Sequence, residues 1–251
     1  MRANLGPSVN LDFLDGYLFR LLQEIASKHG LERSGFDNYY DYRLTQKVGG
    51  LIEYEESLAR HLLEAYPGRR IVHAGIGIGT LACALACNGM TVAGVESYGR
   101  RVESARYLRA ALIETWPDVE ARYEIIEGTF PQALMPSAAP APTPRTFRFL
   151  PWWRAPNPSP GPSSAGNWLD PDAILIFTNV ASTWGDHTQA SIFGCLPRFA
   201  EVLLDLRLFG TVRETDQERT DLFDRIAATA RSAERMPQLA EGSHFARFVF
   251  T

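Results

Sequence analysis

A glycine-rich turn between an apolar run and a helix constrains the fold of this chain more than any other feature. Residues 70–80 read RIVHAGIGIGT, in which Gly75, Gly77 and Gly79 follow a short apolar run. Glycine permits positive φ and lets a ligand approach the bare backbone. Unpaired amides at the start of the following helix suit polar or anionic ligand groups. The segment therefore predicts a strand, a ligand-binding turn and a helix in succession.

A second apolar strand ends in an acid soon after this turn. Residues 92–95 read VAGV, and Glu96 follows them. In a doubly wound sheet, an acidic side chain at this point accepts hydrogen bonds from ribose hydroxyls. A glycine turn alone carries little information. The whole succession of strand, turn, helix, strand and Glu96 predicts a site for an adenosine-containing cofactor.

Strand and helix patterns alternate through the rest of the chain. Short apolar strands that alternate with helices favour a parallel sheet with helices on both faces. Two strand-like pieces on either side of residues 241–243 predict a terminal antiparallel hairpin. The expected fold class is therefore α/β with a doubly wound sheet. We expect strands at 70–74, 91–95, 123–127, 172–179 and 202–209, and helices at 80–87, 100–115, 188–200 and 215–232.

The segment before this alternation predicts a helical cap. A stripe of leucine and isoleucine runs through 10–27, with Asn10 available as an N-cap, and a second helix fits 51–65. We therefore divide the chain into an N-terminal helical cap, 1–66, and a main domain, 67–251.

A proline-rich insertion at 136–171 interrupts the main domain, because so many prolines fit neither a helix nor a strand. One interpretation is a flexible surface segment. The other is a lid whose Trp152 and Trp153 cover a substrate, since long loops in compact domains are often functional.

The charge balance argues against a nucleic-acid partner. The formal net charge is -4 and the sequence pI is about 5.8. Proteins that bind a phosphate backbone usually carry a basic surplus. Small molecules or proteins are therefore the expected substrates.

Neither a signal peptide nor a membrane span is expected from the sequence. The amino terminus lacks a basic segment followed by an apolar core, and no apolar run approaches the roughly 20 residues that a membrane helix needs. We expect a soluble, cytoplasmic protein with no membrane partner.

The cysteines are expected to be structural. Cys83 and Cys87 share one helical face, and Cys195 stands apart. Two ligands cannot complete a structural zinc site, and an odd count without paired spacings does not make a disulfide framework. We expect small buried apolar side chains and no metal site.

The glycine spacing separates two classes of cofactor. The dinucleotide fingerprint is G-x-G-x-x-G, whereas this chain has G-x-G-x-G, so a nicotinamide-dependent dehydrogenase is only a minor alternative. The turn resembles motif I of the class I S-adenosylmethionine-dependent methyltransferases. Residues 95–105, VESYGRRVESA, resemble that family's acidic strand end and the helix that follows. The order of elements over about 68–251, apart from the insertion, resembles the family's Rossmann-like, seven-stranded, mostly parallel sheet.

The resemblance implies S-adenosylmethionine as the cofactor and assigns roles to particular residues. The backbone around Gly75, Gly77 and Gly79 would face the methionine part and the ribose. Glu96 would bind the ribose hydroxyls. Further implied contacts are Ser97 beside the adenine, Thr129 and Phe130 at the adenine edge, and Asn179 and Val180 where cofactor and acceptor meet.

Two positions depart from the family pattern. The family usually has an acid two places before the first glycine, where this chain has His73. This histidine could hydrogen-bond a carboxylate or a water at the methionine end, or could be a satisfied core residue. The family often has Gly-Asp where this chain has Gly128 and Thr129, so Gln132 or a backbone carbonyl would contact the adenine amino group instead.

Missing motifs favour a metal-free enzyme that methylates a small metabolite. Residues 178–182 read TNVAS, unlike the Asn/Asp-Pro-Pro-aromatic motif of nucleic-acid amino methyltransferases. Cys195 follows Gly194, so the Pro-Cys nucleophile of cytosine-C5 enzymes is missing. No carboxylate cluster matches the metal-dependent catechol type.

Methyl transfer is an in-line displacement that needs alignment, exclusion of water and a deprotonated acceptor. The catalytic candidates are Asn179, His187 as a general base, and Tyr40. Tyr40 and its neighbours could equally pack the cap onto the sheet, and His187 could equally begin a helix. The other candidates for substrate contact are Tyr39, Tyr42, Trp184 and Asp186.

Other functions stay open at this point. Attack on another carbon of the sulfonium would give cyclisation or aminopropyl-type transfer. A catalytically silent scaffold could bind the cofactor and use the helical cap to hold a partner. A homodimer is also left open.

Overall fold

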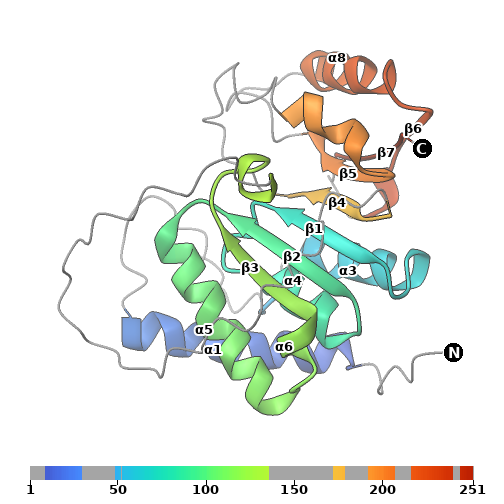
Figure 1. The fold of residues 1–251 in the computed structure, drawn as a ribbon. Coiled ribbons are helices and arrows are strands. Elements are labelled where there is room, and N and C mark those ends of the chain that lie inside the picture. The colour runs from blue at the N-terminus through green and yellow to red at the C-terminus, as the bar shows by residue number, and fades with distance from the viewer. Residues whose placement is uncertain are drawn as a thin grey trace, which may run out of the picture.

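A seven-stranded sheet forms the centre of the molecule in the computed structural model, which describes residues 9–29, 49–51, 53–135, 172–178, 192–206, 216–239 and 244–250 (Figure 1). The strand order is β3-β2-β1-β4-β5-β7-β6. Strands β1 to β5 pair in parallel, and β7 is antiparallel to both β5 and β6. The predicted doubly wound, mostly parallel sheet with a terminal antiparallel hairpin is confirmed. The strands are β1 (Arg70–Ala74), β2 (Thr91–Glu96), β3 (Tyr123–Glu127), β4 (Ile174–Phe177), β5 (Glu201–Asp205), β6 (Ser232–Arg235) and β7 (Phe245–Val249).

Strand β1 is the point at which the strand order reverses. The chain passes from β1 to β2 and β3 on one side, and β4 then pairs with β1 on the other side. His73, for example, pairs with Gly94 of β2 and with Ile176 of β4. In open α/β sheets, ligands bind outside the carboxyl ends of the strands at such a switch point. The glycine turn lies at this point, because it directly follows β1.

Helices cover both faces of the sheet (Figure 1). The first face carries α1, α3, α4 and α5, whose buried side chains form one apolar cluster with residues of β1, β2 and β4. The second face carries α8 and residues 192–199, which form a separate cluster with the opposite sides of the same strands. Successive residues of a strand point to opposite faces of the sheet, so a strand buried on both faces contributes to both clusters in turn. The helices are α1 (Leu11–His29), α3 (Glu53–Ala65), α4 (Thr80–Cys87), α5 (Gly99–Thr115), α6 (Val119–Arg122) and α8 (Asp216–Ala227), with short 3-10 turns at Gln132–Leu134, Leu196–Arg198 and Pro237–Leu239.

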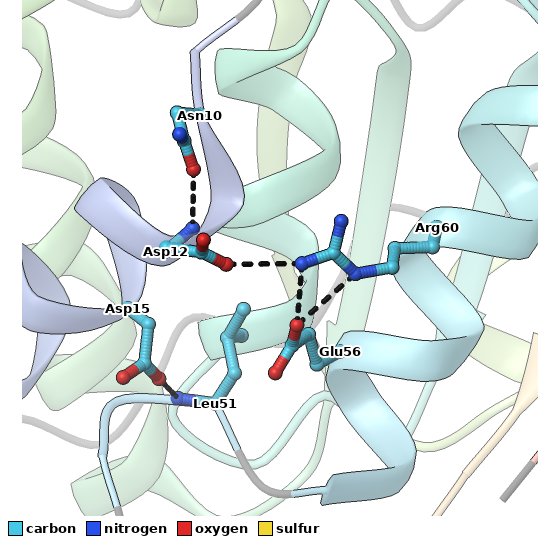
Figure 2. Close-up of polar contacts among 6 residues, drawn as sticks. All are labelled: Asn10, Asp12, Asp15, Leu51, Glu56 and Arg60. Carbon is cyan, nitrogen blue, oxygen red and sulfur yellow. Dashed lines mark hydrogen bonds and ion pairs between the residues drawn. The ribbon is translucent and has the colours of Figure 1, made fainter.

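Helix α1 begins where the sequence predicted, because the Asp12 amide donates to the Asn10 side-chain oxygen at 2.8 Å. Arg60 of α3 links the two N-terminal helices by donating to Asp12 and Glu56 at 3.0 and 2.6 Å (Figure 2). Both helices also bury leucines in the same cluster as the sheet. The division into a cap and a main domain stays a prediction, but α1 and α3 share the core of the sheet.

The hairpin at the end of the chain shifts two predicted boundaries. The helix expected at 215–232 ends at Ala227, because Ser232 already pairs with Val249 in β6. The helix expected at 188–200 is helical over 192–195 in its described part and tightens into a 3-10 turn that contains Pro197. Proline cannot donate the backbone hydrogen bond that would continue the helix. Tertiary pairing and one proline therefore shorten both helices.

The cysteines pack as the sequence predicted. Cys83, Cys87 and Cys195 are buried and free. Burial raises the pKa of the Cys87 thiol to about 12, so this side chain is protonated and behaves as a small apolar group. In the part of the chain that the structure describes, no helix is long and apolar enough to cross a membrane.

Candidate functional site

The turn between β1 and α4 folds over the carboxyl end of β2. Its three glycines, Gly75, Gly77 and Gly79, have φ of 74°, 60° and 83°, the left-handed region that other residues rarely adopt. The amides of Gly75 and Ile76 both donate to the Val95 carbonyl, at 2.9 and 3.2 Å. The predicted turn is therefore fixed to the next strand by its own backbone.

Gly79 has a second reason to be glycine. A Cβ at this position would clash with the hydroxyl of Tyr123, which reaches under the turn from β3. The hydroxyl is fully buried and has no hydrogen-bond partner among the residues that the structure describes. Sequence reasoning placed Tyr123 only as a strand residue, because nothing local shows that its ring reaches the turn.

Glu96 holds the turn from the neighbouring strand. Its carboxylate is 4% exposed and accepts hydrogen bonds from the amides of Gly77, Ser97 and Tyr98 at 2.9, 3.0 and 2.9 Å. The nearest guanidinium nitrogen of Arg101 lies 3.7 Å from the oxygen that binds Gly77. A carboxylate offers about four acceptor positions. The Gly77 bond uses one position on that oxygen, which therefore has room for a further donor.

The loop after β3 joins the same end of the sheet. The Gly128 amide donates to the Glu96 backbone carbonyl at 2.9 Å, and the following Thr129 is exposed. Ser97 is likewise exposed. Phe130 differs, because it is 3% exposed and its ring packs edge-on against Phe177. The structure thus brings Ser97 and Thr129 to the surface beside Glu96, whereas Phe130 supports the loop from within the core.

His73 is a buried, neutral side chain. It is 1% exposed, and its Nε2 lies 2.5 Å from the Thr178 hydroxyl, just after β4. Its Nδ1 is buried and has no hydrogen-bond partner within the described part of the chain. Burial lowers the pKa of His73 to about 3, so the ring carries no charge near neutral pH. The sequence left two roles open for His73, a contact to the methionine end of the cofactor or a core histidine with its hydrogen bonds satisfied. The second role describes Nε2, which contacts Thr178, but not Nδ1.

Helix α4 begins in the interior without a side-chain cap. Its N-cap is Gly79, which makes no side-chain cap hydrogen bond. Thr80, Leu81 and Ala82 are all buried. The first amides of a helix have no partner within the helix. A buried, uncapped helix start of this kind can bind an anionic group.

Glu55 of α3 lies at this same helix start. The Thr80 hydroxyl donates to its two carboxylate oxygens at 3.0 and 3.1 Å. Sequence reasoning missed this contact between the cap and the turn. A signal was available, because Glu55 continues the stripe in which Leu58 and Leu62 are buried, and an acid in an apolar stripe is unusual.

The structure brings together part of the predicted site. The three glycines, Glu96, Ser97 and Thr129 all lie at the carboxyl ends of β1, β2 and β3. His73 and Phe130 lie in the core, and Gln132 is exposed in the 3-10 turn after β3. Other predicted residues fall outside the described ranges, so their roles stay predictions. They are Asn179, Val180, His187 and Tyr40, together with Tyr39, Tyr42, Trp152, Trp153, Trp184 and Asp186.

Known proteins share the fold of this chain but little of its sequence. No family model and no curated sequence relative matches the chain. The methyltransferase domain of bacterial CtHen1 is similar at a TM-score of 0.52 and 12% identity, over 78% of this chain and 96% of that domain. Magnesium protoporphyrin IX methyltransferase from Synechocystis PCC 6803, a structure with bound SAM, is similar at a TM-score of 0.51 and 13% identity, over 96% and 94%. At these identities, the likeness shows that this chain has the Rossmann-like fold of these methyltransferases.

Proposed function

We propose that this chain binds S-adenosylmethionine at the carboxyl ends of β1, β2 and β3 and transfers its methyl group to a small-molecule acceptor. The observation that carries the proposal is the hydrogen bond between the Gly77 amide and the Glu96 carboxylate. It joins the two features that the cofactor requires, a glycine turn and an acid on the next strand, into one rigid unit. The shared fold with methyltransferases supports the same function.

The residues present fit the parts of this cofactor. Ribose hydroxyls are donors, and the Glu96 oxygen that binds Gly77 can accept one of them. The buried start of α4 offers amide donors to a carboxylate. Ser97 and Thr129, both exposed beside Glu96, are suitably placed to flank an adenine. The Asp that the family often has after Gly128 is missing, so Gln132 or a backbone carbonyl remains our proposal for the adenine amino group.

The bound cofactor would supply a sulfonium methyl group, which passes to a nucleophilic atom of the acceptor while the S–C bond breaks and the acceptor loses a proton. The residues of the chain would act mainly by alignment, since this displacement needs little covalent help. Glu96 and the turn would fix the adenosine end. Asn179 and Val180 would line the reaction centre, and His187 and Tyr40 would contact the acceptor, with His187 as the base.

We further propose a metabolite acceptor and a transfer without a metal ion. The net charge of -4 does not favour a nucleic-acid backbone. The sequence carries no carboxylate cluster of the metal-dependent catechol type. One structure with a similar fold, magnesium protoporphyrin IX methyltransferase, carries the name of a small molecule.

Calorimetric titration tests the cofactor, and product analysis tests the reaction. S-adenosylmethionine and S-adenosylhomocysteine should bind, whereas NAD should not. In a screen of small acceptors with methyl-labelled cofactor, turnover should release S-adenosylhomocysteine. Release of methylthioadenosine would replace methyl transfer by attack on another carbon. Binding without turnover on any acceptor would favour a scaffold, and failure of both adenosyl ligands to bind would refute the proposal.

A further inference from the structure

Glu55 is a charged residue in the apolar stripe of α3. It precedes Leu58 by three positions and Leu62 by seven, and both leucines are 0% exposed. Residues at these spacings share one helix face. Glu55 itself is half-buried and receives the Thr80 hydroxyl at 3.0 and 3.1 Å. The stripe therefore directs this carboxylate at the first residue of α4.

The start of α4 thus presents two opposite kinds of group side by side. The amides of its first turn are buried and have no side-chain cap, so they suit an anion. The Glu55 carboxylate, linked to the same turn through Thr80, suits a cation. An α-amino acid carries a carboxylate and an ammonium group on one carbon. The pair of sites therefore matches the amino-acid end of a ligand.

His73 offers no negative charge to a cation. The pKa of His73 is lowered to about 3 by burial, so its ring is neutral near pH 7 and has no charge to offer an ammonium group. Glu96 is assigned to the ribose under the proposed function, because it binds the amides of Gly77, Ser97 and Tyr98 at the adenosine side of the turn. Glu55 of α3 is an acid at the α4 side of the turn, where it accepts the Thr80 hydroxyl.

We propose that Glu55 binds the α-ammonium group of the amino-acid end of the cofactor, while the first turn of α4 binds its carboxylate. This inference rests on the proposed function, because it assigns the second half of the same ligand. Glu55 is then a specificity-determining residue, and α3 of the N-terminal segment is part of the cofactor site. Two carboxylates divide the ligand between them, Glu96 at the ribose and Glu55 at the amino acid.

The test compares ligands with and without the amino-acid end. S-adenosylhomocysteine has it, 5′-methylthioadenosine lacks it, and an S-adenosylhomocysteine analogue with hydrogen in place of the α-amino group lacks only the cation. In calorimetric titration, Glu55→Gln should weaken S-adenosylhomocysteine by about 10- to 100-fold. The same variant should change the affinity of methylthioadenosine and of the deaminated analogue by less than about 3-fold.

Glu56→Gln is the matched control. Glu56 stands next to Glu55 on α3 but faces Arg60, which also binds Asp12 of α1 (Figure 2). The Glu56→Gln variant removes the same charge from the same helix turn and should leave the affinities for all three ligands unchanged. Thermal unfolding of both variants monitors the fold. A merely structural Glu55 would lower the melting temperature without changing the discrimination between the ligands.

The outcomes separate this inference from the function on which it rests. Equal affinity of wild type and Glu55→Gln for S-adenosylhomocysteine would overturn the role of Glu55 and leave the proposed function standing. An equal loss for all three ligands would also overturn it, since the residue would then act on the whole turn. If wild type binds none of the adenosyl ligands, the proposed function fails and the inference fails with it.

Discussion

The two ends of the parallel strands each hold a buried glutamate, and the two glutamates are satisfied in different ways. At the carboxyl end of β2, Glu96 accepts three backbone amides. At the amino end of β5, Glu201 accepts the Tyr66 hydroxyl and the Arg247 guanidinium, both at short range. Each end also holds a histidine, His73 and His61, whose pKa burial lowers.

The difference separates the carboxylate that we propose to bind the cofactor from a structural one. Backbone amides hydrogen-bond Glu96 directly, whereas the Arg101 guanidinium lies 3.7 Å from it, beyond hydrogen-bonding distance, so the carboxylate keeps an acceptor position for a ligand donor. Arg247 supplies a full positive charge to Glu201. Tyr66, which directly follows α3, also donates to Glu201 and so links the end of this helix to the sheet. Burial of an acid is therefore a poor sign of function unless its partners are known.

The largest effect should come from breaking the structural pair. Arg247→Met leaves the Glu201 carboxylate, 11% exposed, without its cation. We expect a loss of about 2–4 kcal/mol in the free energy of unfolding, below the range for a fully buried pair because Arg247 is 34% exposed. Urea denaturation measures it. The double variant Arg247→Met/Glu201→Leu should be more stable than the single variant. Equal losses of unfolding free energy in the two variants would show that the lost packing of Arg247, and not the unpaired Glu201 charge, causes the destabilisation.

The next effect concerns acid and His73. Its folded pKa of about 3 lies below the ordinary 6.5, so the stability it contributes is present above pH 6.5 and is lost as pH falls towards 3. Between about pH 7.5 and about pH 4.5, this group should remove about 2–3 kcal/mol from the free energy of unfolding. Urea denaturation of wild type and of His73→Gln at both pH values isolates the contribution of His73 to the change in unfolding free energy. The same pH dependence in both proteins would mean that His73 does not titrate as a buried group.

A somewhat smaller effect should separate the two glutamates in binding. Glu96→Ala should weaken S-adenosylhomocysteine by about 1–3 kcal/mol, through lost charge-assisted hydrogen bonds. Glu201→Gln is the comparison variant, because it alters the other buried carboxylate. Titration calorimetry should find the affinity of Glu201→Gln close to that of wild type. Unchanged affinity in Glu96→Ala would show that Glu96 does not bind the ligand, and Glu96 and Glu201 would then not differ in function.

The smallest effect is expected from Tyr66→Phe. The variant removes one hydrogen bond to Glu201 and should cost about 1 kcal/mol. Burial, and then the bond to Glu201, raise the pKa of Tyr66 above its ordinary value of 10.0. The contribution of Tyr66 is thus present below pH 10 and is lost at higher pH. Stability curves should show wild type losing more than Tyr66→Phe above about pH 10, and parallel curves would contradict the assigned bond.

Most of the fold followed from local patterns. The glycine turn, the apolar runs and the alternation of elements predicted the five parallel strands and the terminal hairpin, because periodicity and turn chemistry act over a few residues. Two helix ends were misplaced. Ser232 belongs to β6, and Pro197 lies in a 3-10 turn. Pairing with β7 overrode the helical pattern before Ser232, a tertiary effect that a local window does not contain.

The site was predicted to the extent that adjacent strand ends define it. Glu96 was found because an acid at the end of the second strand must lie beside the turn after the first. Glu55 was not found, since its contact with Thr80 joins residues 25 apart that belong to different helices. The bond between Tyr66 and Glu201 spans 135 residues and left no local signal.

The amino-acid sequence by itself determined the order of the elements, the turn that requires three glycines and the acid placed beside it, because these depend on backbone conformation and short spacings. Only the tertiary structure decided how each buried or half-buried carboxylate is compensated. Which amide, hydroxyl or guanidinium approaches Glu96, Glu55 or Glu201 depends on how helices and strands far apart in the chain pack together. In a low-dielectric interior those partners set the properties of each carboxylate.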